Sequence, residues 1–208
     1  NKDYSIFDLN VSIPGENKKT IKKIKLNLIG SHNILNSVGA ISLCLHIGIK
    51  IKIIKNSLKK FSGIQRRLTK RFTFKEREFF DDYAHHPTEI KSVLKSLKLT
   101  SYGRKIISVF QPHRYSRLKF LNKDFSSSFK NSDLVVLCPV YAAGEKIDKK
   151  YNPMTFAKSI TQYSNTQVVL INSEKDLNNF FKKNLISNEI VICMGAGSIS
   201  KWLGEIRF

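Results

Sequence analysis

The side chains best suited to chemistry gather in one stretch, DDYAHHPTE at residues 81–89. Its first six residues supply two carboxylates, one phenol and two imidazoles, groups that accept or donate protons in active sites. The stretch follows the apolar pair Phe79-Phe80 and runs into Pro87, a residue favoured at the start of a helix. Ligands of open α/β sheets bind just beyond the carboxyl ends of the strands. A site is therefore predicted where this strand meets the helix, with a capped polar turn as the simpler alternative.

A second polar stretch, QPHRYSR at residues 111–117, follows the apolar segment that ends at Phe110. Residues three or four positions apart share one face of a helix, so His113 or Arg114 can point the same way as Arg117 if a helix begins here. Two guanidinium groups beside an imidazole can hold a carboxylate through charge-assisted hydrogen bonds. The alternative is a structural basic helix start, which the helix dipole disfavours. The stretch therefore predicts a clamp for a carboxylate ligand.

Polar side chains also gather after Gly30, where a helix is predicted to begin. His32, Asn33 and Asn36 lie at this start, where backbone donors and side-chain amides can bind a purine or a phosphate. Capping of the helix by Asn33 is the simpler explanation. The stretch GAGS at residues 195–198 matches only part of a dinucleotide fingerprint, and it is predicted to be a tight strand-to-helix turn.

The elements that must position these residues fall into two parts, 1–65 and 66–208. The first part is predicted to hold strands at 4–11 and 21–29, a turn at Pro14-Gly15, and helices after Gly30 and at 51–61. The helix after Gly30 is predicted to be amphipathic, with one buried side formed by Ile34, Leu35, Val38, Ile41 and Leu45. In the second part a hairpin at 71–74 and 77–81 leads into alternating helices and strands. Helices are expected from 87, over 118–129, 154–160 and 174–181, and through 202, and strands at 105–110, 134–138, 167–171 and 190–194. Strands rich in Ile and Val without alternation indicate burial on both faces. The predicted fold class is therefore α/β, with a Rossmann-like, mostly parallel sheet flanked by helices.

Composition narrows the classes of function. The 208 residues carry 36 basic and 16 acidic side chains, a net charge of +20. The lysines are spread over every segment, whereas a nucleic-acid-binding protein would cluster them among aromatic residues, so no specific nucleic-acid partner is expected. No apolar run approaches a membrane span and the start does not resemble a signal peptide, so the chain is expected to be cytoplasmic, with no membrane partner. Cys44, Cys138 and Cys193 are predicted to be buried, reduced thiols.

Five stretches together resemble the motifs of the Mur ligases, the enzymes of peptidoglycan precursor synthesis. They are DDYAHHPTEI, GSHNILN at 30–36, FSGIQRR at 61–67, QPHRYSR at 111–117 and VYAAGE at 140–145. They occur in the family's order and cover nearly the whole chain. The resemblance implies that 66–208 is the C-terminal, amino-acid-binding domain and that 1–65 is the end of the central ATP-binding domain.

Within the family, the motifs most resemble those of the members that join L-alanine to UDP-N-acetylmuramate. The resemblance implies ATP with Mg²⁺ as cofactor, UDP-N-acetylmuramate and L-alanine as further partners, and an acyl phosphate intermediate. It places Arg67 at the transferred γ-phosphate and Asp82 near the ATP ribose. It implies ATP binding by His32, Asn33, Asn36, Arg67 and Asp82, amino-acid binding by Tyr83, His85, His113, Arg114 and Arg117, and catalysis by Arg67, Asp82 and His85.

The chain departs from a whole ligase in lacking a GxxxxGK[ST] phosphate loop and the family's Mg²⁺-binding positions. It is therefore expected to be the C-terminal part of a longer ligase, inactive alone and with no metal site of its own. A ligase that attaches a recycled tripeptide to UDP-N-acetylmuramate and a non-catalytic binding module are the alternatives. Sequence does not decide between His85 and His86, although the family match favours His85. No role is assigned to the loop that contains Glu145.

Overall fold

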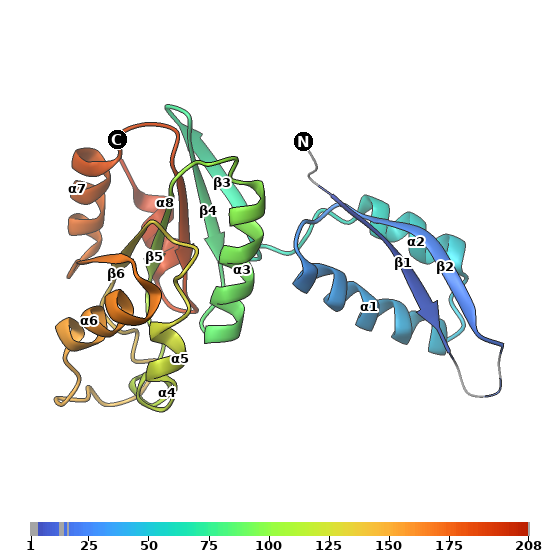
Figure 1. The fold of residues 1–208 in the computed structure, drawn as a ribbon, viewed down its shortest axis with the longest axis horizontal. Helices are drawn as coiled ribbons and strands as arrows, with labels where there is room; N and C mark the ends of the chain where they lie inside the picture. The colour runs from blue at the N-terminus through green and yellow to red at the C-terminus, as the bar shows by residue number, and fades with distance from the viewer. Residues whose placement is uncertain (1–3, 13–14, 16, 208) are drawn as a thin grey trace. The chain divides into compact units, whose positions relative to one another are not determined.

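The computed structural model describes residues 4–12, 15 and 17–207. The chain divides into two compact units, Asn1–Ile64 and Gln65–Phe208, called unit 1 and unit 2 below. Figure 1 shows the helices and strands of both units. Pro14 of the predicted turn lies outside the described residues, and its neighbour Gly15 has a φ of 82°.

Unit 1 pairs a two-stranded antiparallel sheet with two helices. Strands β1 (Ser5–Val11) and β2 (Lys19–Leu26) precede α1 (Ser31–His46) and α2 (Ile51–Lys60), which confirms the predicted elements. Among the described residues, the buried cluster that they share is small and contains Ile21, Ile24, Ile41 and Ile54, and Leu26 of β2 is buried as well.

Two predictions about the buried side of α1 are wrong. Leu35 was expected there but is 70% exposed. It precedes Ile41 by six positions, which at 3.6 residues per turn places it about 120° away around the helix axis. Cys44, expected to be buried, is only half-buried, because it lies at the margin of the same face. Much of α1 therefore presents apolar side chains to the surface of unit 1.

Unit 2 is built on a six-stranded sheet with the strand order β3-β4-β8-β5-β6-β7. All neighbouring strands are parallel except β3 and β4, which form the predicted antiparallel hairpin. The strands are β3 (Thr69–Phe74), β4 (Arg77–Asp82), β5 (Ile106–Phe110), β6 (Leu134–Leu137), β7 (Gln167–Leu170) and β8 (Ile190–Met194). The predicted fold class, a mostly parallel sheet flanked by helices, is confirmed.

Helices cover both faces of this sheet (Figure 1). One layer, which packs on the buried cluster around Phe110 and Phe125, is formed by α3 (Pro87–Thr100), α4 (Tyr115–Phe120), α5 (Asn122–Ser126) and α6 (Pro153–Ser164). The other layer packs on the cluster around Phe79 and Phe181 and is formed by α7 (Glu174–Asn184) and α8 (Ile199–Glu205). Every residue of β5 and β8 is buried, which confirms the inference drawn from their lack of alternation.

The single helix predicted over 118–129 is wrong. The segment forms two short helices, α4 and α5, which meet at Leu121 with φ −111° and ψ 22°. Serine hydroxyls then compete with the backbone, because Ser126 and Ser128 donate to the carbonyl oxygens four residues earlier, at 2.7 and 2.6 Å. Such bonds offer the chain an alternative to a continued helix.

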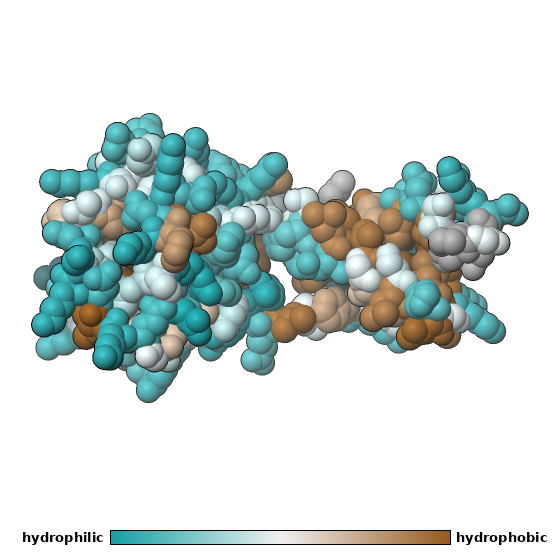
Figure 2. All heavy atoms as spheres, turned by 90° about the horizontal axis from the view of Figure 1, so that it is seen from below, coloured by the Kyte–Doolittle hydropathy of each residue, from teal (hydrophilic) through white to brown (hydrophobic). Residues whose placement is uncertain are grey.

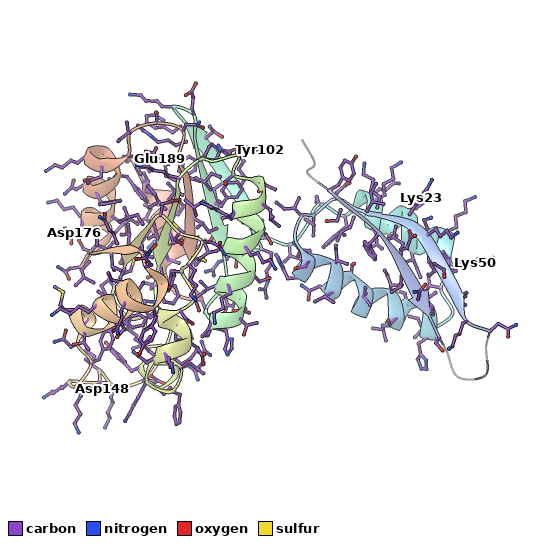
Figure 3. The ribbon with its side chains drawn as sticks, viewed as in Figure 1. Lys23, Lys50, Tyr102, Asp148, Asp176 and Glu189 are labelled. Atoms are coloured by element: carbon purple, nitrogen blue, oxygen red, sulfur yellow. The ribbon has the colours of Figure 1, made fainter. Side chains whose placement is uncertain are left out.

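The two ends of the sheet of unit 2 differ in their polar groups. At the amino ends of β4 and β8, Arg77 and Glu189 form a buried ion pair at 3.4 Å, and Glu189 is labelled at this end of unit 2 in Figure 3. Arg77 also donates to the carbonyl oxygen of Leu185 at 3.0 Å. The carboxyl ends instead carry the stretches singled out by the sequence. Among the described residues, no helix is long and apolar enough to cross a membrane.

Candidate functional site

The carboxyl edge of the unit 2 sheet brings the sequence motifs together. The strands β4, β5, β6 and β8 all end there, since they run parallel. The loops after β5 and β6 form a short parallel bridge between His113 and Tyr141. Its hydrogen bonds run from the Tyr141 N–H to the Pro112 carbonyl oxygen at 2.8 Å and from the Arg114 N–H to the Tyr141 carbonyl oxygen at 2.9 Å. The VYAAGE loop thus fixes the backbone of the QPHRYSR stretch.

Four rings form a row across this edge. Tyr83 meets His85 edge-on at a centroid distance of 5.2 Å, and His85 meets His113 at 5.8 Å. His113 then stacks on Tyr141 at 5.6 Å with 22° between the planes. The row joins the DDYAHHPTE turn to the loops after β5 and β6, so the predicted amino-acid-binding residues Tyr83, His85 and His113 lie together in unit 2.

His113 is at the centre of the row and is held in its neutral form. Arg117 Nη1 lies 3.3 Å from His113 Nδ1. Because a guanidinium only donates, Nδ1 accepts and the ring proton sits on Nε2. Partial burial lowers the pKa of His113, and the charges of Arg117, His85 and Arg114 lower it further, while Glu145 acts in the opposite direction. Arg117 is thereby oriented by the ring that it contacts.

Glu145 fixes the start of the helix that carries Arg117. Its carboxylate accepts hydrogen bonds from the Ser116 N–H at 3.2 Å and from the Ser116 hydroxyl. These bonds hold the pKa of Glu145 below its usual value, and the charge of Arg114 contributes in the same direction. Arg114 is exposed and precedes α4 with a φ of 70°. The loop that the sequence left without a role therefore supports the predicted clamp.

The structure separates the two adjacent histidines. His86 is exposed and caps α3, since its Nδ1 accepts from the Thr88 N–H at 3.3 Å. His85 is half-buried, and its Nδ1 lies 2.9 Å from the Tyr83 carbonyl oxygen. A carbonyl oxygen only accepts, so Nδ1 carries the proton and Nε2 keeps its lone pair. Only His85 belongs to the ring row.

Asp82 is buried at the end of β4, with 2% of its surface exposed. Its two oxygens accept from the Leu68 N–H at 2.6 Å and the Ala84 N–H at 2.7 Å. Burial raises the pKa of Asp82 to about 6, against the opposing effect of these bonds and of Arg67. The carboxyl group therefore joins the segment before β3 to the segment after β4.

The two arginines of FSGIQRR take different positions. Arg66 is held inside unit 2, since its Nη2 donates to the Gly195 carbonyl oxygen at 2.6 Å and its Cζ lies 4.7 Å from the Tyr83 ring centroid. Arg67 is exposed and pairs with Glu89 at 3.8 Å. Arg66 has a φ of 61° and Leu68 a φ of 48°. Left-handed residues on both sides of Arg67 turn its side chain away from that of Arg66.

The glycine loop after β8 is closed by its own neighbours. Buried Gln111 accepts from the Ile199 N–H at 3.0 Å, and its amide donates to the Ser198 hydroxyl at 3.1 Å. A Cβ on Gly197 would come within 2.7 Å of two atoms of Tyr141. The helix start after this loop is thus occupied by protein groups, as expected for a tight turn.

Three of the residues predicted to bind ATP, His32, Asn33 and Asn36, belong to unit 1 and lie in the first two turns of α1. This helix begins at Gly30, with a φ of 97°, and no side-chain hydrogen bond caps it among the residues described. The Asn33 amide donates backward to the Ile29 carbonyl oxygen at 2.8 Å, so Asn33 is not the cap that the simpler explanation required. Asn36 is exposed and His32 half-buried.

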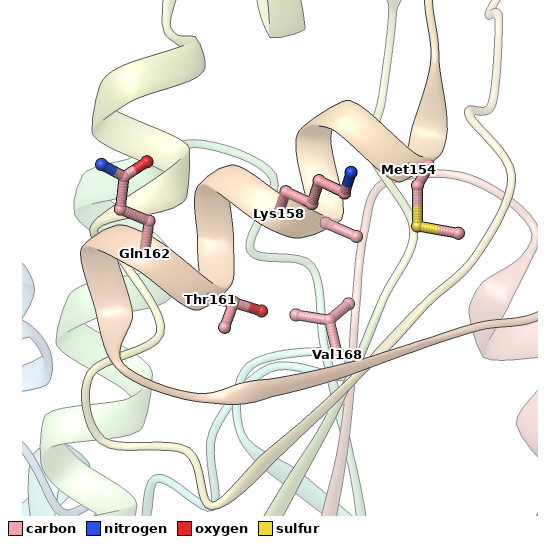
Figure 4. A pocket seen from close by; sticks show the side chains of 6 residues that line it. Met154, Lys158, Thr161, Gln162 and Val168 are labelled. Carbon is pink, nitrogen blue, oxygen red and sulfur yellow. The ribbon is translucent and has the colours of Figure 1, made fainter.

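Two pockets of unit 2 are lined by residues outside the ring row. One, of about 290 Å³, is lined by residues of α6 and β7, including Met154, Lys158 and Val168 (Figure 4). The other, of about 270 Å³, lies beside Tyr115 and Tyr151. In the described part of the chain, no group of three or more His, Cys, Asp or Glu side chains is arranged to hold a metal ion.

Comparison with known proteins explains why these stretches meet. The family model described as Mur ligase, glutamate ligase domain, matches residues 66–197. The chain belongs to the Mur ligase family. The UDP-N-acetylmuramate–L-alanine ligase of Pelagibacter ubique (strain HTCC1062) is 47% identical over 205 residues, which cover 99% of this chain and 44% of that protein. The ligase of the same name from Rickettsia prowazekii (strain Madrid E) is 37% identical and covers 97% of this chain and 42% of its own length.

Solved structures of Mur ligases share the fold. UDP-N-acetylmuramate–alanine ligase of Thermotoga maritima superposes with a TM-score of 0.73 at 25% identity, over 98% of this chain and 45% of that one. A murein peptide ligase of Psychrobacter arcticus gives 0.70 at 19% identity, over 99% of this chain and 45% of that one, a likeness of fold alone. The chain spans less than half the length of these Mur ligases.

Three residues outside the predicted site touch its predicted members, namely Glu89, Tyr141 and Arg66. Glu89 has a sequence signal, because it stands three positions after His86 as a capping box requires. Tyr141 could have been placed at the edge from its position after the strand that ends near residue 138. Arg66 had no signal, since its partner Gly195 is 129 positions away. Which loops meet in this Mur ligase chain depends on the strand order of the sheet.

Proposed function

We propose that this chain is the amino-acid-binding part, with the edge of the ATP-binding part, of a ligase that joins L-alanine to UDP-N-acetylmuramate in peptidoglycan precursor synthesis. The observation that carries the proposal is the cluster of His113 and Arg117 beside His85 at the carboxyl edge of the sheet. Relatives that are named for this reaction cover nearly the whole chain, and the chain alone is expected to be inactive.

The cluster suits an amino acid with a free carboxylate. Arg117 is half-buried and already oriented by His113, and Arg114 adds a second positive charge nearby. An arginine fork binds a carboxylate in two parallel hydrogen bonds. L-alanine held in this way would have its amine fixed, and such fixing makes a bimolecular step effectively unimolecular.

The proposed reaction has two steps. The muramate carboxylate attacks the γ-phosphorus of ATP, the bond from that phosphorus to ADP breaks, and an acyl phosphate forms. The alanine amine then attacks the acyl carbon, loses a proton, and expels inorganic phosphate to leave the amide. Arg67 would stabilise the transferring phosphoryl group. His85 would accept the proton, since its Nδ1 contacts a carbonyl oxygen and its Nε2 keeps a lone pair.

The start of α1 suits the binding of ATP, because it carries no negative charge and offers side-chain hydrogen-bond donors. Its first turn contains no acidic residue and its N-cap is Gly30, and the amides of Asn33 and Asn36 follow within two turns, close to the positive end of the helix dipole. The described residues offer no ligand cluster for Mg²⁺. The ligands of the Mg²⁺ that neutralises the phosphates are proposed to lie mostly outside this chain, which spans 44% of its Pelagibacter ubique relative.

A chimeric ligase tests the proposal. This chain replaces the matching segment of the Pelagibacter ubique relative, and phosphate release is measured with ATP, UDP-N-acetylmuramate and L-alanine. Arg117→Ala should raise the KM for L-alanine about 10–100-fold, the loss expected for a hydrogen bond to a charged group. Lys119→Ala, which removes an exposed cation from the same helix, is the matched control and should behave as wild type.

Three outcomes would contradict the proposal. If the parent enzyme cleaves ATP and the chimera does not, the chain is a binding module. Release that requires a tripeptide instead of L-alanine would identify the recycling ligase. An unchanged KM for L-alanine in Arg117→Ala would remove the clamp.

A further inference from the structure

Glu89 contacts more side chains of the site than its role in capping α3 requires. It occupies the third position of α3 and closes the capping box, because Oε2 accepts from the N–H groups of His85 at 2.9 Å and His86 at 3.1 Å. The same oxygen lies 3.4 Å from His85 Nδ1. The other oxygen, Oε1, lies 3.8 Å from Arg67 Nη1. One carboxylate thus contacts both Arg67 and the His85 ring.

Capping alone does not account for this arrangement. A capping box needs only an acceptor at this position, and glutamine serves as well as glutamate. The contact to Arg67 uses the negative charge, which a cap does not require. The ion pair with Arg67 is partly exposed, with 48% and 32% of the two side chains accessible, and exposed pairs of this kind add little to stability. The effect of Glu89 on position is therefore separable from its effect on folding.

The contact to His85 has a chemical consequence. The Tyr83 carbonyl oxygen and Glu89 Oε2 both face Nδ1, and both are acceptors. They favour the tautomer in which Nδ1 is protonated and Nε2 is the basic atom, as the orienting acid does for a general base. The charge of Glu89 also reaches Asp82, where it adds to the effect of burial in raising the pKa.

We propose that Glu89 is a positioning residue that fixes Arg67 and His85 relative to one another. The inference rests on the proposed function, in which these two side chains serve the phosphoryl group and the amine. One side chain at the start of α3 thus positions both Arg67, which stabilises the transferring phosphoryl group, and His85, which accepts the proton.

Glu89→Gln is the test, because it keeps the acceptor of the capping box and removes the charge. In the chimeric ligase, kcat should fall about 10–100-fold, the scale on which small misplacements slow catalysis, while the KM values for ATP and L-alanine stay within about threefold. The pH profile of kcat should change on its acidic side. The melting temperature should stay within about 2 °C of wild type, since only tenths of a kcal/mol are removed.

Asp176→Asn is the matched control. Asp176 closes a similar cap at the third position of α7, where it accepts from the Asn172 N–H at 3.2 Å. Figure 3 places it on α7, away from α3. This exchange also replaces a capping carboxylate by an amide, and turnover should match wild type.

A second measurement uses the 208-residue chain and needs no activity. Nitrogen NMR of the wild-type chain should show His85 protonated at Nδ1. A pH titration of the carboxyl groups should show that the pKa of Asp82 falls from about 6 when Glu89 is replaced by Gln.

Wild-type kcat in Glu89→Gln, or a loss of kcat matched by an equal loss of folded protein, would overturn the inference. Failure of the wild-type chimera to use L-alanine would instead contradict the proposed function, and the two failures are therefore distinguishable.

Discussion

Units 1 and 2 differ in how completely they enclose their apolar residues. Unit 2 buries two clusters, one on each face of its sheet, whereas the buried cluster of unit 1 contains four isoleucines. In the view of Figure 2, broad hydrophobic areas lie on unit 1 and the surface of unit 2 is mostly hydrophilic. Among the described residues of unit 1, the exposed large apolar side chains are Ile6, Leu35, Leu43, Ile47, Ile53, Phe61 and Ile64.

This difference separates a unit that encloses its apolar core from one that leaves much of its apolar surface exposed. A chain of about 60 residues buries only a modest fraction of its surface and is marginally stable even when its core is complete. Unit 1 leaves several of its apolar side chains outside such a core. The clustered site residues lie in unit 2, where a sheet covered on both faces holds the loops that carry them.

Separating the two units should have the largest effect on stability, and this effect should fall on unit 1. A shortened protein of residues 65–208 is expected to melt cooperatively within about 4 °C of the same transition in the whole chain, a shift below about 1 kcal/mol. Residues 1–64 alone are expected to show no cooperative transition. Circular dichroism melts of both pieces test this expectation, and a sharp transition in the short piece would contradict it.

Phe79→Ala should have the next largest effect on the free energy of unfolding, and this effect should be confined to unit 2. Phe79 is fully buried and packs on Phe72 at 4.6 Å and Phe181 at 5.7 Å between ring centroids. Removing a buried phenyl ring costs about 3–5 kcal/mol. Phe120→Ala is the control, because that ring is 88% exposed. Urea unfolding of both variants measures the difference, and a loss below about 1 kcal/mol for Phe79→Ala would show that the cluster is loosely packed.

The sequence predicted the sheet of unit 2 better than the surface of unit 1. Runs such as IISVF and IVICM lack alternation because helices cover both of their faces, and this property is readable from local composition. Leu35 was misplaced because an exposed apolar residue carries the same signal as a buried one. The end of α5 at Ser126 was missed since the hydroxyl bonds of Ser126 and Ser128 to earlier carbonyl oxygens are invisible to periodicity.

The candidate site was predictable in its motifs and less so in its contacts. The types and spacing in DDYAHHPTE and QPHRYSR indicated a site at one sheet edge, and the strand order then placed them side by side. The contacts of Tyr141 with His113 and of Glu89 with Arg67 join loops far apart in the chain. Such contacts depend on side-chain direction in the folded unit, which sequence spacing does not give.

A smaller effect concerns the pH dependence of unit 2. Burial raises the pKa of Asp82 from 3.8 to about 6, so the folded state binds its proton more tightly than the unfolded state does. The stability from this group is complete below pH 3.8 and is lost as the pH rises through 6. Relative to Asp82→Asn, wild type should lose about 2 kcal/mol between pH 4 and pH 7. Urea unfolding at the two pH values measures this change, and an equal difference at both would mean that Asp82 has an ordinary pKa.

Thiol labelling should show the smallest energetic effect and still distinguish the units. Cys44 of unit 1 is half-buried, whereas Cys138 and Cys193 of unit 2 are buried, and burial raises the pKa of both buried thiols well above the usual value. Because the thiolate is the reactive form, Cys44 should react first with a disulfide reagent. The other two thiols should react at least about 100-fold more slowly, since they must wait for unfolding. Cys44→Ser should abolish the fast phase and leave the melting of unit 2 unchanged. If a fast phase remained in that variant, the sheet of unit 2 would open locally at β6 or β8, and its enclosure would be weaker than its two buried clusters imply.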